Sequence, residues 1–176
     1  MTVCSPLQVR ESAEFTLEQV NVWINNIDGK VSNALAFSGV LIGFILAQGT
    51  PLAFSDFIAV EYVGFCTFLK AVLVVTLYVV SLLSICLFLN AILCRVVVPA
   101  NSRSHLFFGS IQALTYQEYS NEFKNLTEDA YIAELLEQIH INSTICSKKV
   151  KRYNQGIWML FAAVILCFVC FVFQLL

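Results

Sequence analysis

The sequence predicts an all-α integral membrane protein with three transmembrane helices and a helical cytosolic part. Residues 71–94 form a stretch of 24 residues without a charge, and residues 156–176 form another of 21. A bilayer core needs about 20 apolar residues of helix, so each stretch is long enough to span it. The chain is 59% hydrophobic and only 12% charged, which is about half the charged fraction of soluble domains. Within lipid a span pairs its backbone groups internally, so we expect helices.

Residues 1–30 predict a cytosolic amphipathic helix that leads into the first span. Ser12 is the expected N-cap, because acidic residues follow it in the first turn. Beyond it, apolar residues recur at spacings of three and four, which places them on one face of a helix. These residues are Leu17, Val20, Ile24, Ile27 and Val31.

The first span is expected at 31–49, because Gly49 and Pro51 then end the helix. Gly39 and Gly43 lie one turn apart in this span, so they would let another helix approach closely. Two ordinary membrane glycines remain the alternative. An external loop follows at 50–69, and the second span is expected at 70–95.

Polar residues inside the first two spans suggest either a pore lining or contacts between helices. They do not form one clean stripe, so helix packing is the simpler interpretation. The residues in question are Ser38, Thr76, Ser81, Ser84 and Asn90.

Residues 96–155 predict a cytosolic helical region. We expect one helix over 105–124, a break at 125–127, and a new N-cap at Thr127 with a capping-box-like Glu128. A heptad seam follows, with alternating spacings of four and three. Its members are Ile132, Leu136, Ile139, Ser143, Cys146, Val150 and Tyr153. No proline separates this seam from the third span at 156–176, so we expect one helix from 128 into the membrane.

The distribution of basic residues predicts the orientation of the chain. Residues 95–155 carry seven of the ten lysines and arginines, and four of them lie just before the third span. The positive-inside rule therefore places the N-terminus and 96–155 in the cytosol and the C-terminus in the periplasm. The four residues anchor the helix at the membrane, or they also hold phosphates of a nucleotide or of lipid head groups. They are Lys148, Lys149, Lys151 and Arg152.

Catalysis is not expected from this sequence, and neither is a metal site. The two histidines, His105 and His140, have no metal-ligand spacing to each other or to a soluble pair of cysteines. The chain also lacks a glycine-rich phosphate loop and a nucleophile elbow.

Three patches carry a family resemblance that extends over roughly 14–176. They read Trp-Ile-Asn-Asn-Ile-Asp-Gly-Lys at 23–30, His-Leu-Phe-Phe-Gly-Ser-Ile at 105–111, and Glu-Gln-Ile-His-Ile-Asn-Ser at 137–143. Glu118, Tyr119 and Lys149 extend the last two patches. In this order, relative to three spans, the patches resemble the membrane domain of Pycsar effectors, which are anti-phage proteins controlled by nucleotide second messengers.

The resemblance implies a defence effector in the bacterial inner membrane that oligomerises into a channel and disrupts the membrane on infection. A homo-oligomer is expected, with a tetramer as the guess, and a cyclase or nucleotidyltransferase is the expected partner enzyme. The regulatory ligand would be a nucleotide or oligonucleotide, and no other cofactor is expected. A non-conducting membrane-anchored adaptor, which binds a soluble partner through its cytosolic helices, is the alternative.

Seven residues are candidates for contacts with such a nucleotide. Phe108 and Gly109 offer an aromatic face beside an accessible backbone, which suits stacking of a base. Amide and ammonium groups nearby would supply hydrogen-bond donors. The alternative is that all seven hold the cytosolic helices together. The candidates are Asp28, Lys30, Phe108, Gly109, Gln138, Asn142 and Lys149.

Overall fold

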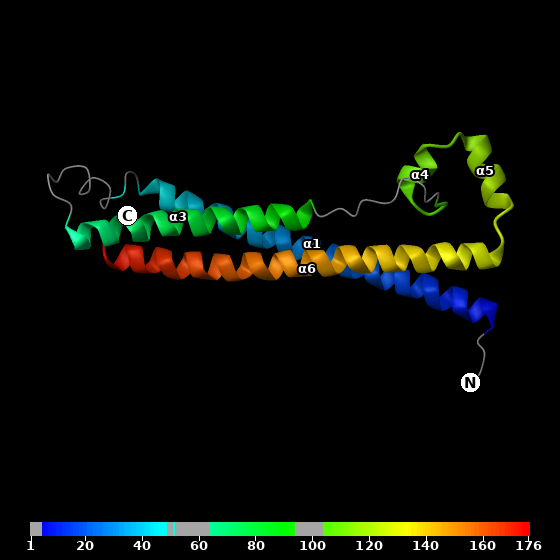
Figure 1. Cartoon of the computed structure of the whole chain (residues 1–176), viewed down its shortest axis with the longest axis horizontal. Coiled ribbons are helices and arrows are strands. Elements are labelled where there is room, and N and C mark those ends of the chain that lie inside the picture. The colour runs from blue at the N-terminus through cyan, green and yellow to red at the C-terminus, as the bar shows by residue number, and fades with distance from the viewer. Residues whose placement is uncertain (1–4, 49–50, 52–63, 94–103) are drawn as a thin grey trace. The chain divides into compact units, whose positions relative to one another are not determined.

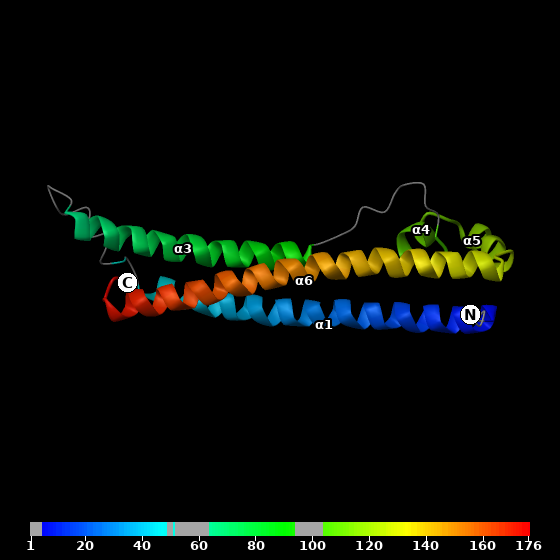
Figure 2. The same ribbon diagram turned by 60° about the horizontal axis from the view of Figure 1, so that its bottom comes forward.

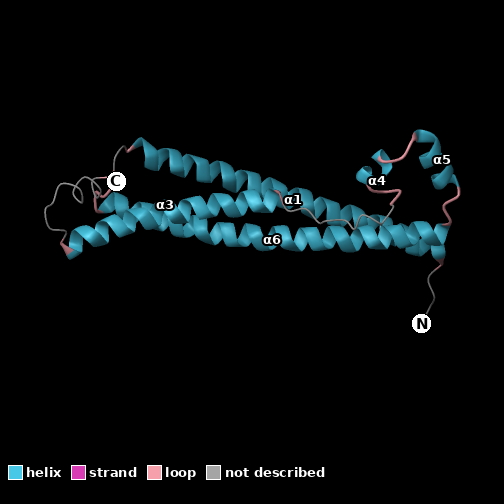
Figure 3. Cartoon of the chain, turned by 45° about the horizontal axis from the view of Figure 1, so that its top comes forward, coloured by secondary structure: helices cyan, strands magenta, loops and turns pink. Residues whose placement is uncertain are grey.

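The computed structural model describes residues 5–48, 51, 64–93 and 104–176. The described residues form helices and connecting loops without any strand, so the all-α prediction is confirmed (Figures 1 and 3). The helices are α1 (Pro6–Ala47), α3 (Phe65–Ile92), α4 (Phe108–Gln112), α5 (Tyr116–Lys124) and α6 (Glu128–Val172).

Helix α1 begins six residues before the predicted N-cap. The backbone N–H of Gln8 donates to Ser5 Oγ at 3.4 Å, and the Ser5 N–H donates to Gln8 Oε1 at 3.2 Å. This reciprocal pair is a capping box, and Pro6 suits the first helical position because it has no N–H to leave unpaired. The assignment of Ser12 as the N-cap is therefore wrong, and Ser12 lies inside the helix.

The predicted single helix over 105–124 is also wrong, because α4 and α5 are separate. The Glu118 N–H donates to Thr115 Oγ1 at 3.3 Å, and the Thr115 N–H donates to Glu118 Oε2 at 2.9 Å. This capping box starts a new helix at Tyr116.

The predicted break before α6 is confirmed. Thr127 Oγ1 accepts from the Ala130 N–H at 3.3 Å, as an N-cap does. Glu128 is the first residue of the helix rather than the third, so it is not the partner in a capping box. As predicted, α6 then continues without a break to Val172.

The chain divides into two compact units. Unit 1 comprises 1–26 and 94–148, and unit 2 comprises 27–93 and 149–176. The two long helices, α1 and α6 (Figure 2), each have one segment in unit 1 and another segment in unit 2. Helices α1, α3 and α6 each contain an 18-residue window of mean hydropathy 1.7, 2.8 and 2.4, respectively, long and apolar enough to cross a membrane. Because α3 begins at Phe65, part of the predicted external loop is helical.

Unit 2 is a bundle of three helical segments, with two apolar clusters along its length. In one cluster Val31 of α1 packs with Phe88 of α3 and Leu160 of α6. In the other, Ile45 of α1 packs with Val74 of α3 and with the buried Cys167 and Cys170 of α6. The order of these contacts makes α3 antiparallel to the segments from α1 and α6, as three successive membrane crossings require. Both cysteines are buried and pack within the second cluster.

The row of α6 that faces its neighbours differs from the predicted heptad seam. The sequence predicts the seam through positions 136, 143 and 150, and the structure instead directs positions 135, 142 and 149 inward. Leu136 is 52% exposed, whereas Leu135 is 2% exposed. Counting by sevens from Leu135 leads to Asn142 and then to Lys149, which is only 6% exposed. Hydrophobic pattern alone favours Leu136 and Val150, because it passes over the half-buried amide of Asn142 and the buried cation of Lys149.

Close approach of α3 and α6 in unit 2 depends on Gly156. A Cβ atom at this position would lie 2.6 Å from Cε1 of the buried Phe88 ring. Nearby, Ser84 Oγ donates to the Gly156 carbonyl oxygen at 3.2 Å. Side chains of α3 therefore contact the backbone of α6 directly at this point.

We predict that Gly156→Ala destabilises unit 2 by about 1–3 kcal/mol, because the Phe88 ring must move from a packed site. Thermal unfolding of the detergent-solubilised protein measures this loss. Gly39→Ala is the matched control, since no atom lies within 4 Å of a Cβ added at Gly39. Equal stability of the two variants would contradict the close contact.

Candidate functional site

The first candidate site is an ion pair in unit 2 between α1 and α6. Lys149 Nζ lies 2.5 Å from Asp28 Oδ1. The Lys149 side chain is 8% exposed and that of Asp28 is 40% exposed. A buried ammonium group is stable only with a charged partner, so Asp28 explains why a lysine occupies an otherwise apolar row. Both residues are candidates from the sequence, and the structure brings them together.

The neighbouring basic residues have a different environment. Lys148, Lys151 and Arg152 are exposed, which fits the predicted anchor at the membrane surface. Lys149 is therefore the only buried member of that cluster. Lys30 is exposed too and does not join the Asp28–Lys149 pair.

The remaining nucleotide-binding candidates belong to unit 1, where Gln138 and Asn142 bind other residues of the unit. Gln138 Nε2 donates to Ser104 Oγ at 3.3 Å, and Asn142 Nδ2 donates to Asn21 Oδ1 at 2.9 Å. A Cβ on Gly109 would lie 2.6 Å from Cε1 of Phe107. The Phe108 side chain lies outside the described part. These contacts hold unit 1 together.

A cluster around His105 connects three parts of unit 1. Both carboxylate oxygens of Glu134 in α6 contact His105. Oε1 lies 2.5 Å from the ring nitrogen Nδ1, and Oε2 accepts a hydrogen bond from the backbone N–H at 2.9 Å. Glu122 of α5 lies 3.5 Å from His105 Nε2. Sequence reasoning missed this cluster, because 29 residues separate His105 from Glu134 and no motif links them.

Three cavities of unit 1 lie beside these contacts, with volumes of about 420, 420 and 470 Å³. The first contains a cation, Arg10, together with Glu128. Glu14 and Glu18 line the second cavity, and Glu122 and His105 line the third, and no lysine or arginine is among the described residues of either lining. An anionic ligand is therefore best suited to the first cavity, which we call the Arg10 cavity.

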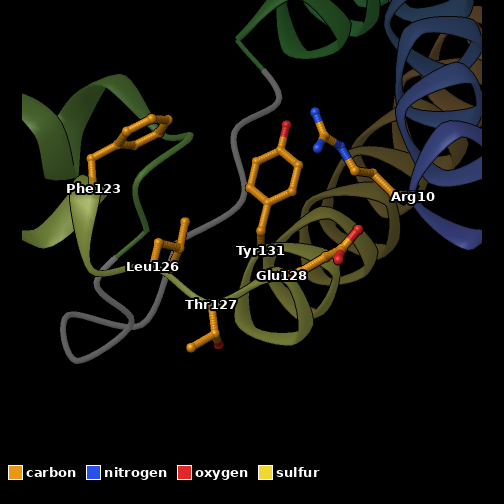
Figure 4. Close-up of a pocket in the computed structure, with 6 residues that line it drawn as sticks. All are labelled: Arg10, Phe123, Leu126, Thr127, Glu128 and Tyr131. Atoms are coloured by element: carbon orange, nitrogen blue, oxygen red, sulfur yellow. The ribbon is translucent and has the colours of Figure 1, made fainter. Parts of the chain in front are cut away.

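The Arg10 cavity places a guanidinium group beside the Tyr131 ring, with Phe123 on the opposite side (Figure 4). Arg10 Cζ lies 5.4 Å from the centroid of the Tyr131 ring, and Phe123 lies on another wall. Arg10 Nε donates to Glu14 Oε1 at 2.9 Å, and Tyr131 OH donates to the same oxygen at 3.2 Å. The hydrogen bond from Arg10 holds the pKa of the Glu14 carboxyl below its usual value. Arg10 is thereby oriented by both the carboxylate and the ring.

The polar residues of the spans point in different directions. Ser38 is buried and donates to the Ala34 carbonyl at 2.8 Å, and Ser84 binds Gly156 across the bundle. Ser81 Oγ is buried without a partner among the described residues. Asn90 is exposed.

The glycines of the first span are exposed as well. Gly39 and Gly43 have no atom within 4 Å of an added Cβ, so no close helix contact within the described chain explains them. Their surface is open to lipid or to another copy.

Comparison with known proteins decides the family. A profile described as the Pycsar effector protein domain matches residues 12–176, which is most of the chain. This chain belongs to the Pycsar effector family. It is also similar to the Pycsar effector protein GmPycTM of Gulbenkiania mobilis, with 29% identity over 178 residues, covering 92% of this chain and 90% of that protein. No solved structure matches it.

As a Pycsar effector with three membrane-spanning helices, the chain is a transmembrane effector of anti-phage defence. The match begins at residue 12 and includes both long helices almost entirely. The ion pair, the His105 cluster and two of the three cavities lie inside the matched region. The Arg10 cavity lies mostly within it, but Arg10 itself precedes residue 12.

We predict that Lys149→Ala lowers the free energy of unfolding of this Pycsar effector by about 1–2 kcal/mol. This range is below that of a fully buried pair because Asp28 is partly exposed to solvent. Lys148→Ala is the control, since Lys148 is exposed, and thermal unfolding in detergent is the measurement. Recovery in the charge-swapped double variant Asp28→Lys, Lys149→Asp would support the pairing. Equal effects at 148 and 149 would contradict it.

Proposed function

We propose that this transmembrane effector oligomerises into an ion-conducting pore in the bacterial inner membrane and disrupts that membrane on infection. The observation that carries the proposal is the exposed surface of the spans. Their most apolar windows are only 17%, 28% and 28% buried within one copy. A single copy thus leaves most of each span free for lipid or for further copies. No catalytic step is part of the proposed function.

The orientation follows from charge. Lys148, Lys151 and Arg152 are exposed in the middle of α6, just before its apolar stretch, which suits contact with acidic head groups on the cytosolic leaflet. Unit 1 and the N-terminus are then cytosolic, and the C-terminus is periplasmic. In this orientation unit 1 is accessible to a soluble nucleotide, which a cyclase or nucleotidyltransferase would supply.

The Arg10 cavity is the place in unit 1 that best suits such a ligand. A phosphate would bind the guanidinium group of Arg10, and a base would stack against Phe123, which is 47% exposed. The candidates Gln138 and Asn142 already bind Ser104 and Asn21. Arg10 binds Glu14 through Nε, and its terminal nitrogens donate to no other described residue, so they are available to a phosphate. We therefore favour Arg10 over these two as the ligand contact.

Ion flux through the purified full-length protein in liposomes tests the function. We expect flux that changes when one member of a panel of cyclic and linear nucleotides is added. Arg10→Gln should remove most of that response, and Lys124→Gln is its control, because Lys124 does not line the cavity. A response that survives Arg10→Gln would contradict the ligand site.

Absence of flux under all conditions, from protein shown to be inserted, would contradict the pore. It would favour a membrane-anchored adaptor, for which the 52% exposed Leu136 offers a contact surface on α6. An adaptor leaves the membrane potential intact when it is expressed in cells. A voltage-sensitive dye therefore separates the two functions independently of the purified system.

Contact between copies through the first span makes a further prediction. Replacement of Gly39 and Gly43 together by isoleucine should abolish the toxicity and depolarisation caused by expression, because bulky side chains prevent close helix approach. Val79→Ile, on the exposed surface of α3, is the matched control. Unchanged toxicity of the glycine variant, at equal expression, would exclude this contact as the basis of the pore.

A further inference from the structure

Helix α1 has one face that is packed within the chain and an opposite face that follows a seven-residue repeat. The packed face includes Ala13 and Val20 in unit 1 and Val31, Ser38 and Ile45 in unit 2, all of them buried. At about 100° per residue, positions 15, 22, 29, 36 and 43 lie on the far side of the helix. We call this far side the outer seam.

One row of the outer seam consists of amides. Gln19, Asn26 and Asn33 follow one another at intervals of seven residues, and none of them has a side-chain hydrogen bond within the described chain. Asn26 and Asn33 are exposed, and Gln19 is partly exposed. Asn33 lies within the first predicted span, where an unpaired polar side chain facing hydrocarbon is costly. Such a residue is expected to face a partner.

The second row of the outer seam is apolar or small. It contains Phe15, Val22, Gly29, Ala36 and Gly43, again at intervals of seven, and all five are exposed. A glycine inside a helix costs about 0.5–1 kcal/mol relative to alanine. No atom lies within 4 Å of a Cβ added at Gly29 or Gly43, so contacts within the described chain do not require either glycine. Close approach of another helix would explain both.

Charge is absent from both rows. The charged residues of α1 that follow residue 12 are Glu14, Glu18, Asp28 and Lys30, and each lies outside these two rows. The residues that flank the rows include Glu18 on one side and Lys30 on the other. In a parallel pair of α1 helices, a flanking residue of one copy faces the residue five positions further along on the opposite flank of the other copy. At this offset no two like charges face each other.

We propose that a second copy of this chain docks on the outer seam, with the two α1 helices parallel and in register. A side-chain amide both donates and accepts, so Gln19, Asn26 and Asn33 each complement their own counterparts. An amide inside a heptad seam favours a parallel, in-register pairing. Copies inserted in the same orientation are already parallel. The inference rests on the proposed oligomer and identifies its contact surface.

Cysteine cross-linking in vesicles of phosphatidylethanolamine and phosphatidylglycerol tests the seam. The full chain, with its seven native cysteines replaced by serine or alanine, carries one new cysteine, by Val22→Cys or by Ala36→Cys. Leu82→Cys is the control, because Leu82 is 61% exposed on α3. Photobleaching of single labelled particles of the unmodified chain counts the copies independently.

We expect both seam variants to form disulfide-linked dimers at least tenfold faster than Leu82→Cys. If photobleaching counts several copies in each particle but the Leu82→Cys variant cross-links fastest, the outer seam is not the contact surface. The proposed oligomer would then still hold. Particles with single copies that conduct ions would overturn the seam and the oligomer, but not the proposed conduction.

Side-chain variants give a second test that does not depend on oxidation. Asn33→Leu should weaken association in vesicles by about three- to tenfold, as loss of one hydrogen bond between membrane helices does. Asn33→Gln retains the amide and should restore most of the association. If Asn33→Leu and Asn33→Gln associate equally, the amide row is not an interface.

Discussion

A seven-residue repeat of inward-facing positions is the constraint on which the structure depends. In α6 it runs from Leu135 through Lys149 and Gly156 to Cys170, and in α1 it includes Val31, Ser38 and Ile45. A repeat of seven keeps one face of a long helix directed at its neighbours, whether the surroundings are water or lipid. The side chains in the row change along each helix, while the spacing is constant.

Two positions in the α6 row show how this constraint overrides residue type. Lys149 is buried because Asp28 of α1 neutralises it within the same unit. Gly156 occupies the row because the Phe88 ring leaves no room for a Cβ. One position therefore needs a charged partner and the other needs the absence of a side chain.

The features that suit function lie on the surfaces that this packing leaves free. Unit 1 presents a cavity with a guanidinium group beside the Tyr131 ring, while the described residues that line the other two cavities include carboxylates but no lysine or arginine. Unit 2 presents exposed glycines and the amide of Asn33 along α1, which contacts within the described chain do not explain. A membrane effector whose cytosolic part receives a signal, and whose spans contact other copies, would use both surfaces.

The sequence by itself determined the all-α class, the three long apolar helices, the apolar face of α1 and the break at Thr127, because these follow from local periodicity and capping. It did not determine the first residue of α1 or the division between α4 and α5, because Ser5 and Thr115 compete with other caps. Only the tertiary structure decided which row of α6 is buried, since Lys149 requires a partner 121 residues away. It likewise decided that Arg10, Phe123 and Tyr131 share a cavity, because periodicity along one helix carries no information about contacts between helices.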